Sequence, residues 1–275
     1  MKRLFFVSVF FLSLFSAHSA GSDTDVTLQG AIGKLAATVH KPELKSGEKC
    51  PIVIMCHGFG GDRKSGLFTS IADTLKAHGI ASILFDFNAH GESEGRFRDM
   101  TVPNEIEDAK CIYNYVASLP YVSKVAVVGH SQGGVVSAML AGELGGRKIK
   151  AVVLMAPAAV LRDDAIRGNT FGAQYNPLDP PEVVRLFGNR ELGRDYIKTA
   201  FSLPIYETSE KYDGPACIIH GTGDRIVPYT YGERFHHIWK DSELHLLEAY
   251  GHGFEPDWHK ASMMAAAYLI KKLKR

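Results

Sequence analysis

The chain has 275 residues, of which 45% are hydrophobic, and a formal charge of +1. A chain of this size can bury one sizeable core, so its length does not require two domains. The near-neutral charge gives no reason to expect nucleic acid or an anionic membrane surface as a partner.

The first twenty residues have the pattern of a signal peptide. Two basic residues near the start precede an apolar stretch at 4–15, and small residues follow at 16–20. The apolar stretch is too short to span a bilayer, and no later segment reaches the length that a membrane span needs. We therefore expect cleavage after Ser19 or Ala20 and an exported mature protein, either periplasmic or secreted.

Beyond the leader, strand-like and helix-like segments alternate. We expect strands at 23–28, 31–40, 51–56, 81–87, 124–129, 150–155, 216–220 and 244–247, and helices at 67–78, 104–119, 131–144, 230–239 and 258–274. Short apolar runs between amphipathic segments indicate a mostly parallel sheet with helices on both faces. With an antiparallel hairpin at its start, this pattern predicts a single α/β-hydrolase domain over residues 21–275, built on an eight-stranded sheet.

The alternation stops between about residues 158 and 207, where the sequence has low regularity and no clear core strand. Insertions of this length in a compact domain are more often functional than plain loops. This one follows the sixth core strand, above the carboxyl ends of the strands, where ligands bind in open α/β sheets. We expect it to form a cap over an active site.

The strand at 124–129 ends in the motif Gly129-His-Ser-Gln-Gly133, and a helical segment follows. This is the layout of a nucleophile elbow, in which Ser131 occupies a tight strand-to-helix turn and the two glycines permit close approach of the chain. A second Gly-x-Ser-x-Gly match surrounds Ser93, but two glutamates flank that serine and no helix follows, so we interpret Ser93 as a loop residue.

A serine hydroxyl needs a neighbouring base, and that base needs an acid to orient it. In α/β-hydrolases the chain order is serine, acid, histidine. Asp224 follows a buried strand in the motif His220-Gly-Thr-Gly-Asp224, and His252 follows the last strand. The order and context predict a catalytic triad of Ser131, Asp224 and His252.

An oxyanion requires two hydrogen-bond donors that are in place before the reaction. The backbone N–H of Gln132, directly after the nucleophile, is one candidate. The second is the N–H of Phe59, which lies in a His-Gly loop after the third strand. We expect His57 to support this loop, and we assign no role to Asp62 or Asp86.

Neither zinc-binding spacing nor a cysteine pair typical of metal sites occurs, and we expect no metal or organic cofactor. The four cysteines lie in strand or helix patterns, at Cys50, Cys56, Cys111 and Cys217. Buried thiols are the simpler interpretation, although export would permit disulfides.

Several motifs are distributed over nearly the whole mature chain: His57-Gly-Phe-Gly-Gly61, Gly129-His-Ser-Gln-Gly-Gly134, Ala156-Pro-Ala158, Gly168-Asn-Thr170, Tyr175-Asn-Pro177, Leu203-Pro-Ile-Tyr-Glu207 and His220-Gly-Thr-Gly-Asp224. Together they resemble the motifs of bacterial cinnamoyl (feruloyl) esterases. The elbow and acid motifs are shared with many hydrolases, whereas the cap motifs are more specific to this family.

The resemblance implies a small cap over a pocket for an aromatic acyl group. In that family an acid and a tyrosine of the cap contact the phenolic hydroxyl of the substrate, and the matching positions here are Asp164 and Tyr196. Phe171 occupies a position where some relatives carry a glutamine. Without the resemblance, the two polar residues would be interpreted as a turn-capping Asp and a Tyr packed within the cap.

The expected function is that of an exported serine carboxylesterase that hydrolyses hydroxycinnamate esters, such as ferulate linked to plant cell-wall polysaccharide. The alternative is a general acyl esterase or a serine peptidase of the same fold. A third class is a non-catalytic binding protein that kept the fold. The complete triad argues against it, because binding alone does not require a nucleophile, a base and an acid.

Overall fold

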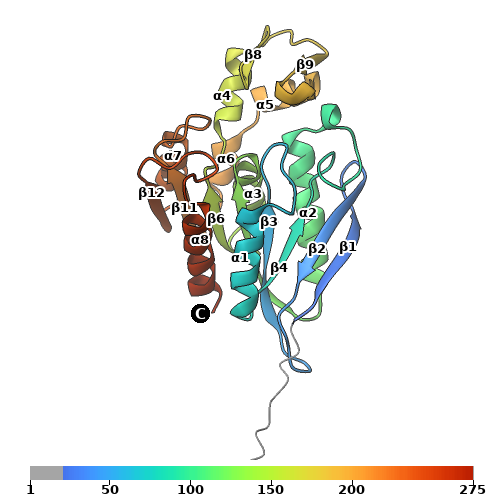
Figure 1. Cartoon of the computed structure of the whole chain (residues 1–275), viewed down its shortest axis with the longest axis vertical. Helices are drawn as coiled ribbons and strands as arrows, with labels where there is room; N and C mark the ends of the chain where they lie inside the picture. Colours follow the sequence, from blue (N-terminus) through green and yellow to red (C-terminus); the bar gives the residue numbers. More distant parts are fainter. Residues whose placement is uncertain (1–20, 275) are drawn as a thin grey trace, which may run out of the picture.

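The computed structural model describes residues 21–274, and the expected signal peptide at 1–20 lies outside the described residues. Eight strands form one sheet in the order β1-β2-β4-β3-β5-β6-β11-β12 (Figure 1). They are β1 (Asp23–Gln29), β2 (Lys34–His40), β3 (Cys50–Cys56), β4 (Ala81–Phe85), β5 (Val122–His130), β6 (Ile149–Met155), β11 (Ala216–Gly221) and β12 (Ser242–Leu247). β2 runs antiparallel to both of its neighbours, β1 and β4, and the other pairs of adjacent strands in this sheet are parallel. The predicted α/β-hydrolase sheet is confirmed.

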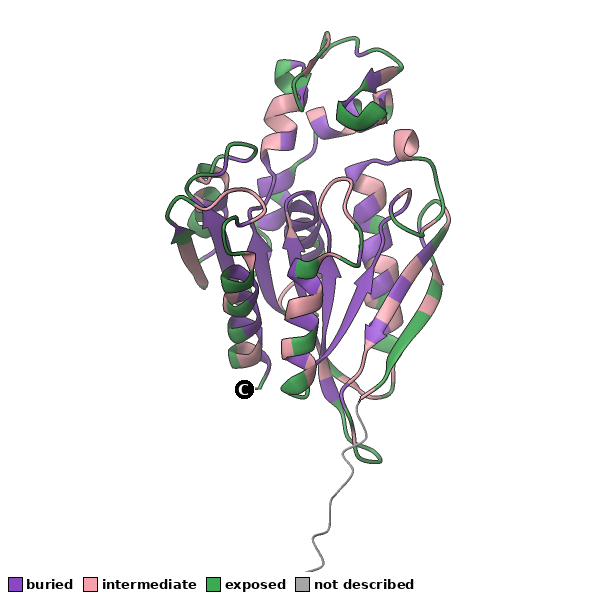
Figure 2. Cartoon of the chain, in the orientation of Figure 1, coloured by how far each residue is buried: buried purple, intermediate pink, exposed green. Residues whose placement is uncertain are grey.

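Helices cover both faces of the sheet, which is why its central strands are buried (Figure 2). One face carries α1 (Gly66–Ala77) and α8 (Trp258–Leu273), and the other carries α2 (Val102–Ser118), α3 (Gln132–Leu144) and α7 (Thr230–Ile238). Successive side chains of β3 point to opposite faces of the sheet, so alternate residues pack against the two helix layers. Ile52 and Ile54 pack toward α2 and α3, whereas Val53 and Met55 pack toward α1 and α8. No helix within residues 21–274 combines the length and apolarity needed to cross a bilayer.

The observed element bounds differ from the expected ones mainly at turns. β2 begins at Lys34 rather than at residue 31, because the Gly30 N–H donates to the carbonyl of Gly33 (2.8 Å) and closes the hairpin. β4 ends at Phe85, and the carboxylate of Asp86 then accepts a hydrogen bond from a backbone amide of the neighbouring loop.

The segment between β6 and β11 forms a cap beyond the carboxyl ends of the strands (Figure 1). It contains short helices and small hairpins: α4 (Val160–Arg167), β7 (Asn169–Thr170), β8 (Ala173–Gln174), β9 (Val183–Arg185), η2 (Phe187–Asn189), β10 (Glu191–Gly193), α5 (Arg194–Phe201) and α6 (Ile205–Ser209). A further short turn, η1 (Phe97–Asp99), contacts β10 from the core side. The sequence predicts no regular elements here, because segments this short carry little periodicity.

The four cysteines are free thiols in the described structure, so no disulfide joins them. Cys50, Cys56 and Cys217 are buried, and Cys111 is half-buried. Burial raises the pKa of the Cys56 thiol to about 12. These thiols therefore act as small core side chains.

Ser131 occupies a tight turn between β5 and α3. Its backbone has φ 56° and ψ −125°, a conformation that L-residues rarely adopt. The turn is held from three directions, since the Ser131 N–H donates to the carbonyl of Met155 (2.9 Å) and the Ser131 carbonyl accepts from Gly134 (2.9 Å) and Ala158 (3.0 Å). Such a turn directs the serine side chain away from the helix that follows.

Two glycines allow the chain to pack tightly around this turn. A Cβ at Gly129 would lie 2.1 Å from the carbonyl oxygen of Gly133. A Cβ at Gly133 would lie 2.1 Å from the oxygen of Cys56 and 2.3 Å from that of His57. Because these contacts are with backbone, no side-chain rotation can relieve them.

We expect Gly133→Ala to destabilise the protein by about 1–3 kcal/mol, because the added methyl group would push β3 and its loop away from α3. The free energy of unfolding in urea measures this effect. Gly134→Ala is the matched control, since the nearest atom to its added Cβ is 3.0 Å away. Equal stability losses in the two variants would contradict the argument from close packing.

Candidate active site

The structure brings together the three residues expected to form the triad. The Ser131 hydroxyl lies 2.9 Å from Nε2 of His252, and Nδ1 of His252 lies 2.7 Å from Oδ2 of Asp224. Asp224 lies in the loop after β11, and His252 lies in the loop after β12. With Nδ1–H donating to the carboxylate, Nε2 is free to accept the serine proton.

Asp224 is held by hydrogen bonds to both of its carboxylate oxygens. Oδ1 accepts from the backbone N–H groups of Ile226 and Val227, each at 2.8 Å. Oδ2 accepts from His252, and Nε2 of the buried His220 lies 3.3 Å from the same oxygen. Burial by itself raises the pKa of Asp224. The hydrogen bonds from the two histidines lower the pKa by more than burial raises it, so the net pKa lies below its usual value. The carboxylate therefore stays ionised at neutral pH.

A third histidine, His130, supports the loop that carries His252. Its Nε2–H donates to the backbone carbonyl of His252 (2.9 Å), and the two rings lie 5.0 Å apart. Burial and the neighbouring His252 lower the pKa of His130 to about 4, so its ring is neutral at pH 7. Its role in the structure is to position the loop.

The expected oxyanion donors flank the serine. Gly58 passes so close that a Cβ there would lie 2.9 Å from Cβ of Ser131, which places the Phe59 amide beside the serine. Gln132 begins α3, so its N–H has no partner within the helix. Within residues 21–274, neither the Phe59 nor the Gln132 amide donates to another protein group.

Two buried histidines hold the loop that contains Phe59. His57 donates from Nδ1 to the carbonyl of Gly58 (2.8 Å) and accepts at Nε2 from the Phe87 amide (3.0 Å). His90 accepts at Nε2 from the Gly60 amide (3.1 Å). Burial lowers the pKa of His57 to about 3, with a smaller contribution from His90. Both rings of this pair therefore act as neutral supports, as expected for His57.

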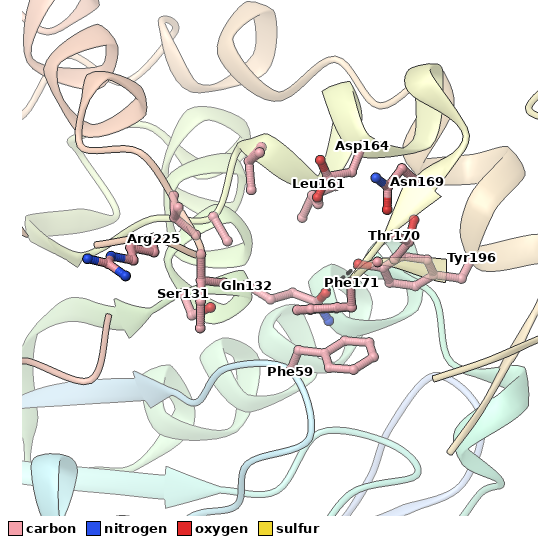
Figure 3. A pocket seen from close by; sticks show the side chains of 15 residues that line it. Phe59, Ser131, Gln132, Leu161, Asp164, Asn169, Thr170, Phe171, Tyr196 and Arg225 are labelled. Carbon is pink, nitrogen blue, oxygen red and sulfur yellow. Dashed lines mark hydrogen bonds between the residues drawn. The ribbon is translucent and has the colours of Figure 1, made fainter. Parts of the chain in front are cut away.

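A cavity of about 330 Å³ opens between Ser131 and the cap (Figure 3). We call it the acyl cavity; its lining includes Phe59, Ser131, Gln132, Val160, Leu161, Asp164, Thr170, Phe171, Tyr196, Arg225 and Val227. Phe59 packs against Phe171, with ring centroids 4.7 Å apart, and Ser131 lies at the opposite end of the cavity from Tyr196. The lining combines apolar side chains, such as Phe59, Leu161 and Phe171, with polar ones, such as Asp164, Thr170 and Tyr196.

Asp164 is the carboxylate in the wall of the acyl cavity. Within the described chain its side chain has no hydrogen-bond partner, and it projects from α4 toward the cavity (Figure 3). Burial raises the pKa of Asp164 to about 6, against the opposing effect of Arg167. An acceptor for a ligand hydroxyl is therefore available where the sequence motifs predict one.

Tyr196 also lines the acyl cavity, but its hydroxyl already has a protein partner. It donates to Oε1 of Gln132 (2.7 Å), while Nε2 of Gln132 donates to Glu105 (2.8 Å). The Tyr196 hydroxyl can still accept a hydrogen bond from a ligand, because its oxygen has free lone-pair capacity. Its hydroxyl thus connects the cap to α3 in addition to lining the cavity.

Glu105 is a buried residue next to Gln132 that was not predicted from the sequence. Burial raises its pKa well above the usual value for a glutamate, and the hydrogen bond from Gln132 opposes this shift. Glu105 lies on the same face of α2 as the buried Ala109, Ile112 and Val116. A glutamate on the apolar face of a predicted helix is a sequence signal that could have identified Glu105 as a buried carboxyl group.

Arg190 was also missed, because it lies in the irregular part of the cap. It donates to the carbonyl of Gly60 (3.3 Å), and its guanidinium lies over the ring of Phe97 at 5.6 Å. The sequence around a single arginine in an irregular segment gives no signal for such a contact. In the structure it connects the cap to the loop that carries Phe59.

The chain is similar in sequence and in fold to several known proteins. Residues 47–176 match the family described as serine aminopeptidase, S33. The quorum-quenching protein AidA of Acinetobacter baumannii is 30% identical over 136 residues, which cover 48% of this chain and 43% of AidA. Human ABHD12B is 26% identical over 200 residues, which cover 70% of this chain and 51% of ABHD12B. The chain thus spans about half the length of these curated relatives.

The structure of Est1E from Butyrivibrio proteoclasticus with ferulic acid bound is similar over almost the whole chain. The TM-score is 0.86 at 26% identity, and the match covers 91% of this chain and 100% of Est1E. This match confirms the resemblance predicted from the sequence motifs. The protein has the α/β-hydrolase fold.

Proposed function

We propose that the protein is an exported serine carboxylesterase that hydrolyses hydroxycinnamate esters, with ferulate esters of plant cell-wall polysaccharide as the natural class. The observation that carries the proposal is the hydrogen-bonded series Ser131–His252–Asp224 at one end of the acyl cavity. The backbone amides of Phe59 and Gln132, near the same serine, donate to no other group of residues 21–274. These are the parts that acyl transfer requires.

The reaction follows from these positions. His252 takes the proton of Ser131 as the hydroxyl oxygen attacks the ester carbonyl, and the amides of Phe59 and Gln132 stabilise the oxyanion. His252 then gives the proton to the leaving alcohol, and a water molecule repeats the sequence on the acyl-enzyme. Asp224 keeps the imidazole oriented and stabilises its protonated form.

The acyl cavity supports an aromatic acid as the acyl group. A cinnamate is a flat ring on a rigid arm, and the slot between Phe59, Phe171 and Leu161 is apolar. Asp164 offers an acceptor to a 4-hydroxyl, and Tyr196 offers a second polar contact. The ferulic acid bound to Est1E supports the same ligand class.

A serine peptidase is the second candidate, because the matching family is described as serine aminopeptidase. Asp164 favours it as well, since a carboxylate in the cavity wall would attract the amino group of a peptide.

We expect a rate order that separates the two candidates. If the cavity binds hydroxycinnamates, kcat/KM for methyl ferulate should exceed kcat/KM for a short aliphatic ester and for an aminoacyl amide, each by about tenfold or more. Steady-state assays on the three substrates test this. A faster reaction with the aminoacyl amide would favour the peptidase, and a faster reaction with the aliphatic ester would favour a general esterase.

We expect Ser131→Ala to lower kcat on methyl ferulate by a factor of about 10⁴ or more, because no nucleophile remains in the site. Labelling by a fluorophosphonate probe should be lost together with turnover. The thermal unfolding midpoint serves as a control for folding, and Ser93→Ala is the matched substitution in the other Gly-x-Ser-x-Gly sequence. Substantial turnover by the Ser131 variant would refute the assignment of the nucleophile.

We expect Asp164→Asn to lower kcat/KM for methyl ferulate by about tenfold, while methyl cinnamate, which lacks the 4-hydroxyl, changes little. The pKa of about 6 adds a pH signature. Above pH 6 the side chain is a carboxylate and a strong acceptor, and below pH 6 it becomes a neutral and weaker one. The preference for ferulate over cinnamate should therefore fall as the pH is lowered through about 6 in the wild type only. An identical pH dependence in both proteins would exclude contact with the hydroxyl.

A further inference from the structure

A buried carboxyl group lies behind the wall of the acyl cavity. Glu105 is 1% exposed and lies in the first turn of α2, a helix that packs against α3 and α5. Among residues 21–274 its side chain pairs with no cation, and its hydrogen-bond partner is the amide of Gln132. Burying a carboxyl group costs free energy, and a leucine of similar volume would pack there without this cost. The carboxyl group therefore calls for a reason other than stability.

The side-chain amide of Gln132 is bonded at both ends. Its Nε2–H donates to Oε2 of Glu105 (2.8 Å), and its Oε1 accepts from the Tyr196 hydroxyl (2.7 Å). A tyrosine hydroxyl can donate or accept, so Tyr196 alone would permit either orientation of the amide. A carboxyl oxygen that carries no proton can only accept, so Oε2 of Glu105 requires the amide nitrogen on its own side. Glu105 thus decides which end of the amide faces Tyr196.

This orientation is transmitted to the acyl cavity, because Gln132 and Tyr196 are among its lining residues. The Tyr196 hydroxyl directs its proton to the amide oxygen of Gln132, so a ligand meets the lone pairs of the tyrosine oxygen. An acyl ring with a hydroxyl group can donate to that oxygen, whereas a bare ring cannot. The direction of a hydrogen bond in the cavity therefore depends on a residue behind its wall.

We propose that Glu105 is a positioning residue that acts through Gln132 to hold the Tyr196 hydroxyl as a hydrogen-bond acceptor toward the ligand. This role rests on the proposed function and deepens it, because Glu105 then sets how strongly the cavity prefers a hydroxylated acyl ring to a bare one. Glu105 itself contacts neither the acyl group nor the reacting atoms.

The test measures a selectivity ratio, which is kcat/KM for methyl 4-hydroxycinnamate divided by kcat/KM for methyl cinnamate. Glu105→Leu, which keeps most of the side-chain volume, should lower this ratio about fivefold, mainly through KM for the hydroxylated ester. Glu105→Gln should keep the ratio within about twofold of the wild type, because its amide oxygen can still accept from Gln132. In a Tyr196→Phe background, Glu105→Leu should leave the ratio unchanged, since the hydroxyl that it positions is gone.

Ile112→Ala is the matched control, because Ile112 is buried on the same face of α2 and is not among the residues that line the acyl cavity. Loss of packing at Ile112 should affect both esters alike and leave the ratio unchanged. The same result for Glu105→Leu would show a merely structural role and overturn the proposal. Equal losses of the ratio in Glu105→Gln and Glu105→Leu would overturn it too, as would an effect of Glu105→Leu that persists in the Tyr196→Phe background.

A second measurement needs no substrate. The urea midpoints of Glu105→Leu, Tyr196→Phe and the double variant should be non-additive, because both residues act on the same amide. Additive shifts would overturn the proposal whatever the enzyme hydrolyses, and so would a wild-type selectivity ratio near one. If the wild type hydrolysed neither ester, the proposed function would fail, whereas non-additive shifts would still support the connection from Glu105 through Gln132 to Tyr196.

Discussion

The Ser131 hydroxyl reaches the acyl cavity because two backbone segments pass at van der Waals distance. The first turn of α3 lies against the end of β3 so closely that Gly133 leaves no space for a Cβ beside the carbonyls of Cys56 and His57. The same approach places Gly58 against Ser131 and the Phe59 amide beside the serine. Strain at Ser131 persists because hydrogen bonds to Met155, Gly134 and Ala158 hold the turn.

The site is assembled from the core and the cap together, and Gln132 is the residue where they meet. Its backbone amide is the proposed oxyanion donor, and its side chain is held between Tyr196 of the cap and Glu105 of α2. Arg190 makes a second connection, from the cap to the loop that carries Phe59. Because both proposed oxyanion donors are tied to the cap, packing of the cap and the geometry of acyl transfer depend on each other.

Most of the fold could be predicted from the sequence, because the core strands are buried on both faces and so form short, continuous apolar runs. The positions of Ser131, Asp224 and His252 could be predicted for a related reason: each follows a core strand, and the carboxyl ends of parallel strands meet at one edge of the sheet. The partners of Glu105 could not be predicted, because helical periodicity shows that a side chain is buried but not which group it meets. The elements of the cap were missed because each spans too few residues.

The sequence by itself determined the order of the elements, the glycine-lined turn at Ser131 and the residue types available for acid, base and nucleophile, since these depend on local pattern and spacing. Only the tertiary structure decided that the Tyr196 hydroxyl bonds to Gln132, that Asp164 faces the acyl cavity with no hydrogen-bond partner among residues 21–274, and that Arg190 of the cap bonds to Gly60. These facts depend on contacts between segments far apart in the chain, and such contacts are set by the packing of the whole molecule rather than by neighbouring residues.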